Sequence, residues 1–148
     1  MAESSWIVVA SKDHVQRGVS AGFAQACHGK GSPLRRMQPG DWLIYYSSKA
    51  EYGLRAKCQC FTAIGQVVDA EIYQHAVSPD FVPFRRNVRF LTCTEVPIAP
   101  LIPRLNFITN KQRWGGVFRF GMLQIGSEDF SLLAKLMQPA ELEQPINA

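Results

Sequence analysis

Strand-like segments follow one another through the middle of the chain, and they leave few folds open. Each segment is apolar throughout or alternates apolar with polar residues, which is typical of buried and half-buried β-strands. The predicted strands cover residues 6–10, 42–47, 57–69, 84–95 and 116–125. Three prolines in VPIAPLIPRL, residues 96–105, exclude a regular helix or a central strand there, because proline has no amide hydrogen to donate.

The first predicted strand leads into an amphipathic helix. Ser11 is a suitable N-cap, and the apolar face continues as far as Ala26. Gly18 and Gly22 lie on this face, although each glycine costs a helix about 1 kcal/mol relative to alanine. The two glycines therefore predict a close approach of the helix to a sheet or to a ligand.

The order of these elements predicts the fold class. A second helix covers residues 127–137, and the tail from about residue 139 is expected to be frayed. Since strands and helices do not alternate regularly, we expect an α+β fold: a small, mostly antiparallel β-barrel with flanking helices, rather than a doubly wound sheet. A length of 148 residues suits a single domain, 1–148.

Composition narrows the class of protein further. Apolar residues make up 47% of the chain and charged residues 19%, which excludes a disordered tail and a coiled coil. The longest apolar runs are too short to cross a bilayer, and the first residues, MAESSWIVV, do not resemble a signal peptide. We therefore expect a cytoplasmic, monomeric protein without a membrane partner.

The charge is unevenly distributed along the chain. Residues 1–127 carry fifteen Lys and Arg against eight Asp and Glu, a balance of +7, whereas residues 128–148 carry one against four, a balance of −3. A basic body of this kind favours polyanions, although an ordinary solvated surface would look the same. The arginines expected to contact a nucleic-acid backbone are Arg35, Arg36, Arg85, Arg86 and Arg89.

Neither a metal site nor a catalytic site is predicted from the cysteines. Structural zinc sites usually have two close pairs of the C-x2-4-C kind, and Cys27-His28 and Cys58-x-Cys60 do not fit. A cysteine nucleophile needs a histidine within hydrogen-bond reach, which adjacency in sequence to His28 disfavours. We therefore expect reduced, mostly buried thiols, no cofactor and no metal; an enzyme using Cys27 or His28 stays as an alternative.

A recognition pocket is the third possibility. Aromatic residues stand beside polar groups in Tyr45-Tyr46-Ser47, at the end of a strand, and in FITNKQRW, a polar loop from Phe107 to Trp114. An unpaired base can stack on such rings and be read by hydrogen bonds to its edge. Packing in the core is the alternative for any single ring.

Taken together, these segments resemble an EVE domain of the short, single-domain bacterial kind. The resemblance runs from Trp6 to Met137 and is carried by WIVVASKDHVQRGVSAGFAQACHGKGSPLRRMQPGDWLIYYS, FTAIGQVVD, FVPFRRNVRF, PLIPRLNFI and RWGGVFRFGMLQIGSEDF. It implies a PUA-like fold, a small β-barrel with helices around it, related to ASCH and YTH domains. It also implies a non-enzymatic protein that reads a modified base of RNA or DNA in a pocket between helix and barrel.

The resemblance assigns the polar corner QACHGK to the rim of that pocket. On this basis Tyr46 or Trp114 would stack on the base, polar side chains would meet its edge or a phosphate, and Cys27 would serve packing. The expected ligand-binding residues are Ser11, Gln25, His28, Lys30, Tyr46, Ser47, Phe107 and Trp114. The alternative to a nucleic-acid reader is a pocket for a free nucleoside or another small molecule.

Overall fold

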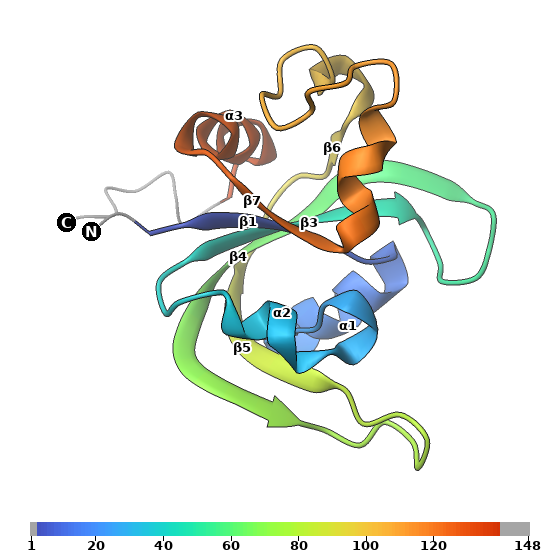
Figure 1. Cartoon of the computed structure of the whole chain (residues 1–148), viewed down its shortest axis with the longest axis vertical. Helices are drawn as coiled ribbons and strands as arrows, with labels where there is room; N and C mark the ends of the chain where they lie inside the picture. Colours follow the sequence, from blue (N-terminus) through green and yellow to red (C-terminus); the bar gives the residue numbers. More distant parts are fainter. Residues whose placement is uncertain (1–2, 140–148) are drawn as a thin grey trace.

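A computed structural model describes residues 3–139 and places their strands in one curved sheet (Figure 1). The strand order is β2-β5-β4-β3-β1-β7, and β6 pairs with β4 outside this path. The strands are β1 (Ser5–Val9), β2 (Phe23–Ala24), β3 (Trp42–Lys49), β4 (Lys57–Gln74), β5 (Phe84–Leu91), β6 (Val96–Pro97) and β7 (Met122–Ile125). Beyond Pro139, the tail expected to be frayed lies outside the described residues.

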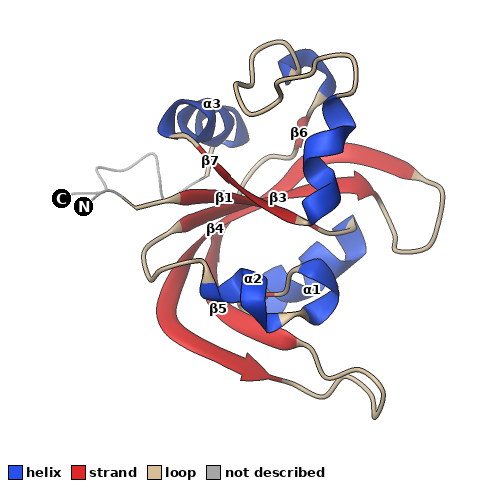
Figure 2. Cartoon of the chain, in the orientation of Figure 1, coloured by secondary structure: helices blue, strands red, loops and turns tan. Residues whose placement is uncertain are grey.

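The predicted α+β fold class is confirmed, with one correction to its geometry. Only β1 and β3 run parallel; every other pair in the described residues is antiparallel. The sheet bends strongly along β4 and β5, but its strand order ends at β2 and at β7, so the expected barrel is not closed (Figure 2). The ladder between β4 and β5 shifts register between Val67 and Ile72, a local irregularity of the kind that bends a strand.

Helical segments flank the sheet. The α-helices are α1 (Lys12–Ala21), α2 (Gly31–Arg35) and α3 (Ser127–Met137). Three short 3-10 segments are η1 (Cys27–Gly29), η2 (Ala99–Leu101) and η3 (Trp114–Phe120). Within the described residues, no helix is long and apolar enough to span a bilayer.

The first helix is shorter than its apolar pattern suggests. Gly22 adopts a left-handed conformation (φ 79°) and ends α1, so that Phe23 and Ala24 form β2 instead of a fourth turn. The close approach expected of Gly18 is confirmed, since a Cβ atom there would lie 2.6 Å from the carbonyl oxygen of Phe23.

The strand predicted over 116–125 is wrong in its first half. Residues up to Phe120 form η3, and Gly121 turns the chain with φ 77° before β7 begins. This turn lets Phe118 point into the core, where its ring stacks on Tyr46 with centroids 4.0 Å apart.

Apolar side chains fill both faces of the central strands. Ile7 and Ile44 belong to one core cluster, which α3 covers with Leu133 and Met137. The neighbours of Ile7 and Ile44 in sequence point to the other face of the sheet, where a second core cluster lies under α1 and α2. This cluster contains Trp6, Val8, Leu43 and Tyr45 from the strands, together with Val15 from α1 and Leu34 from α2. Burial on both faces explains why β1 and β3 read as continuous apolar runs.

Candidate functional site

A cavity of about 870 Å³ opens where α1, the ends of β1 and β3, and η1 meet. The polar corner QACHGK forms part of its wall through Gln25, Cys27, His28 and Gly29. Gly121, which precedes β7, also lines the cavity and lies beside Cys27. The cavity therefore lies between the two ends of the strand order.

The charge of the cavity is strongly one-sided. Four cationic side chains line it, from Arg17, Lys49, Arg85 and Arg119, and none of the described lining residues is a carboxylate. Arg17 forms an exposed ion pair with Asp13 at 3.3 Å, which is worth little in water. A cavity lined in this way concentrates anions.

Gln25 is held from two sides. The guanidinium of Arg85 lies 3.8 Å from the ring centroid of Phe23, and its Nε donates to the side-chain oxygen of Gln25 at 2.8 Å. The Tyr45 hydroxyl donates to the backbone carbonyl of Gln25 at 3.1 Å, and burial raises the pKa of Tyr45 so that it keeps this proton. Because Arg85 occupies the side-chain oxygen, the Gln25 side chain offers its NH2 group to a ligand.

The turn after Gln25 carries backbone strain. Cys27 and His28 both have left-handed φ values, 49° and 60°, at a cost of about 1–3 kcal/mol each. The Cys27 thiol contacts the carbonyl oxygen of Phe120 at 3.3 Å, and a Cβ atom on Gly121 would lie 2.8 Å from its sulfur. Among the described residues, no hydrogen bond joins the Cys27 thiol to a histidine.

Exposed rings complete the walls. Tyr52 stacks on His14 with centroids 5.2 Å apart and an interplanar angle of 15°, yet 62% of Tyr52 is exposed. Phe81 lines the cavity and is 41% exposed. The sequence did not predict His14, Tyr52 or Phe81 as site residues. His14 lies in α1 and the other two lie in loops, and only the fold brings these three segments together.

Three of the eight expected ligand residues line this cavity: Ser11, Gln25 and His28. Ser11 precedes α1 but does not cap it through its side chain, since its hydroxyl donates to the Asp13 carboxylate at 2.5 Å. Lys30 is exposed but is not part of the lining.

The other expected ligand residues lie elsewhere. Tyr46 is 1% exposed and Ser47 is fully buried, with its hydroxyl 2.9 Å from that of Thr62. Phe107 and Trp114 both pack edge-on against Phe118, in the core cluster under η3. Core packing, the alternative named for each ring, describes these positions.

The five expected backbone contacts also separate. Only Arg85 lines the cavity. Arg35 and Arg36 are exposed on and just after α2, over the rings of Phe84 and Trp6, and Arg89 is exposed on β5.

Arg86 is buried and cannot contact a phosphate in this conformation. Only 2% of it is exposed. Its guanidinium donates to the backbone carbonyls of Leu34 and Met37, both at 2.7 Å, and to that of Asp69 at 2.8 and 3.1 Å. It joins α2 to the sheet, which is a structural role.

Comparisons with known proteins place this architecture in a family. The chain is 52% identical over 127 residues to a UPF0310 protein of Bacillus licheniformis, covering 86% of each chain. It is 51% identical over 134 residues to a UPF0310 protein of Mycolicibacterium vanbaalenii, covering 90% of this chain and 92% of that one.

A solved structure shares the fold at low identity. The crystal structure of the MmI1 YTH domain matches with a TM-score of 0.59 and 9% identity, covering 96% of this chain and 100% of that one. The family model described as EVE domain matches residues 4–136. The chain therefore belongs to the EVE domain family, as its ordered motifs suggested.

Proposed function

We propose that the protein binds single-stranded nucleic acid and holds one extruded, modified nucleobase in the cavity, without chemical turnover. One observation carries this proposal: four cations and no carboxylate line the part of the cavity that the structure describes, next to exposed aromatic rings. Cations neutralise phosphates and rings stack on bases, which is the usual combination in single-strand binding. The sharing of a fold with a YTH domain supports the same class of function.

The cavity suggests a division of labour among its residues. Arg17 and Arg119 are exposed and suit the phosphates that flank the base, whereas Tyr52 and Phe81 offer faces for stacking. The NH2 group of Gln25, fixed by Arg85, suits an acceptor on the edge of the base. Gln25, which the sequence already suggested as a ligand-binding residue, keeps that role in this assignment. Tyr52 and Phe81 take the stacking role that was expected of Tyr46 or Trp114. We further propose that the protein acts as a cytoplasmic monomer.

A salt titration tests the phosphate contacts. Fluorescence anisotropy with short single-stranded RNA and DNA should show a linear fall of log affinity with log salt. Replacing Arg17 and Arg119 together by Ala should flatten that slope by about 1.4, at ~0.7 per phosphate contact. Arg104→Ala is the matched control, because Arg104 is exposed but does not line the cavity.

The same titration separates the proposal from a small-molecule pocket. A free neutral nucleoside that binds as tightly as the oligonucleotide, with no salt dependence in either case, would replace the proposal by that alternative.

Tyr52→Ala tests stacking. We expect a loss of ~1–3 kcal/mol in binding, roughly 5- to 150-fold in affinity, with little change in melting temperature because the side chain is mostly exposed. Leu54→Ala, an exposed apolar residue outside the lining, should bind as the wild type does. Equal affinities for all three proteins would remove Tyr52 from the site. Oligonucleotides with and without modified bases then identify the base that is read.

A further inference from the structure

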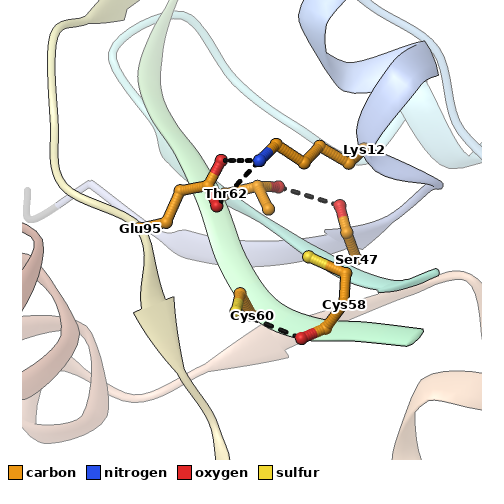
Figure 3. A network of polar contacts seen from close by, with 6 residues as sticks. All are labelled: Lys12, Ser47, Cys58, Cys60, Thr62 and Glu95. Carbon is orange, nitrogen blue, oxygen red and sulfur yellow. Dashed lines mark hydrogen bonds and ion pairs between the residues drawn. The ribbon is translucent and has the colours of Figure 1, made fainter. Parts of the chain in front are cut away.

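A second group of reactive side chains lies outside the cavity, at the start of β4. Figure 3 shows Cys58 and Cys60 on this strand, with Glu95 approaching from the chain just before β6. The two sulfur atoms and a carboxylate oxygen all lie within 4.8 Å of one another. β6 pairs with β4 next to Cys60, which holds Glu95 beside the two thiols.

The backbone between the two cysteines departs from a regular strand. Gln59 has a left-handed φ of 53°, and its carbonyl oxygen accepts a hydrogen bond from Ile98 at 3.0 Å. A non-glycine residue in this conformation costs about 1–3 kcal/mol, and such strain persists where the surrounding structure fixes it. Here it sets the relative positions of the two sulfur atoms.

The spacing of these atoms suits a tetrahedral metal ion. Zn–S bonds of ~2.3 Å and Zn–O bonds of ~2.1 Å place tetrahedral ligand atoms roughly 3.5–3.8 Å apart. The separations of up to 4.8 Å exceed this range by roughly 1 Å, so binding requires side-chain rotations that bring the three ligand atoms together. Glu95 is exposed, so water can reach a fourth position.

The charge also suits the ion. Two thiolates and one carboxylate around a divalent cation leave a net charge of −1. The ammonium group of Lys12 lies 2.9 and 3.1 Å from the two carboxylate oxygens of Glu95 and supplies the balancing charge (Figure 3). About a third of each of these side chains is exposed, so their pairing is weak enough to adjust to a metal.

We propose that Cys58, Cys60 and Glu95 bind Zn²⁺, with Lys12 as the balancing cation. The sequence did not predict this site, because the zinc motif tested there combined Cys58 and Cys60 with Cys27 and His28. Cys27 and His28 line the cavity instead. A carboxylate ligand 35 positions away in sequence has no local signature.

Cobalt tests the site directly, because Co²⁺ replaces Zn²⁺ with the same ligands and reports thiolate coordination by absorption. The full chain, reduced and with its free thiols counted, is titrated with Co²⁺. We expect thiolate-to-metal charge-transfer absorption and the visible bands of tetrahedral cobalt at one equivalent, both removed by one equivalent of Zn²⁺.

Variants then assign the ligands. Cys58→Ser and Cys60→Ser should each abolish the charge-transfer band or weaken Co²⁺ binding at least tenfold. Glu95→Gln should weaken binding with the band retained. Cys93→Ser is the matched control, because Cys93 packs against the core outside this cluster, and it should bind as the wild type does. Circular dichroism of the metal-free variants verifies that each is folded.

Three results from the wild type and the ligand variants would overturn the proposal. They are a reduced wild-type protein that shows no charge-transfer absorption, an absorption unchanged in both Cys58→Ser and Cys60→Ser, and a Glu95→Gln protein that binds as tightly as the wild type. Loss of the band in Cys93→Ser would equally reject the three-ligand site.

Discussion

Arg86→Ala should destabilise the fold strongly and leave the salt dependence of nucleic-acid binding unchanged. The substitution removes four hydrogen bonds to three backbone carbonyls, those of Leu34, Met37 and Asp69. Leu34 and Met37 are buried, so water cannot easily replace the lost donor at their carbonyls.

The expected magnitude follows from these carbonyls. Removing Arg86 leaves the Met37 carbonyl without a partner in the described part of the chain, which costs about 1–3 kcal/mol. The Leu34 carbonyl keeps the Met37 N–H at 3.3 Å and loses one hydrogen bond, which costs about 0.5–1.5 kcal/mol. The carbonyl of Asp69, which lies at a half-buried residue, adds less. At about 3 °C per kcal/mol for a chain of this length, the melting temperature should fall by roughly 5–14 °C.

Urea unfolding followed by tryptophan fluorescence gives the free energy of unfolding, and anisotropy below the melting transition gives the salt slope. Arg86→Lys is the matched control: it keeps the charge but cannot reach all three carbonyls, so it should lose an intermediate amount of stability. An Arg86→Ala protein of wild-type stability, with a salt slope flattened by about 0.7, would show instead that Arg86 turns outward to a phosphate.

Two further substitutions test the packing around the cavity, and a third tests the core. Gly121→Ala should lower the free energy of unfolding by about 2 kcal/mol, because the φ of Gly121 is left-handed and the new Cβ would meet the Cys27 sulfur. Measured by urea unfolding, this loss should be smaller when Cys27 is also replaced by Ala. Strictly additive losses would contradict the contact. Gly18→Ala should lower the melting temperature although alanine favours helices, since its Cβ would meet the Phe23 carbonyl; a more stable protein would contradict the close approach. Tyr46→Phe should preserve or raise the free energy of unfolding, by up to ~1–3 kcal/mol, because the Tyr46 hydroxyl is buried without a partner in the described part of the chain; a loss of affinity at unchanged stability would instead return Tyr46 to the site.

The sequence predicted the strands well where hydrophobic patterning determines them. β1 and β3 are apolar on both faces because a core cluster covers each face, and this pattern can be recognised in the sequence alone. Closure of the sheet into a barrel could not be predicted from the sequence, because it depends on whether the strands at the two ends of the sheet pair with each other. The pattern also extended the first helix through Gly22, because an apolar face continues past a residue whose left-handed backbone ends the helix.

The site was harder to predict than the fold. The polar corner around Gln25 and His28 does line the cavity, and it was found through a family motif. Tyr52 and Phe81 come from loops, where no periodicity indicates which way a side chain points. Arg86 shows the opposite error: a basic run on a strand places alternate residues on opposite faces, so one arginine turns inward where its neighbour Arg85 reaches the cavity.

The unpaired ends of the sheet bear on how such a pocket changes over evolution. Within the described residues, no strand pairing joins β2 to β7. Between these two strands the wall of the cavity is held by side-chain contacts, such as that of the Cys27 thiol with the Phe120 carbonyl. Mutations that widen or narrow the gap between β2 and β7 therefore break no ladder hydrogen bonds between these two strands. Under the proposed function, relatives that differ in the base they bind are expected to differ at this gap more than in the paired strands.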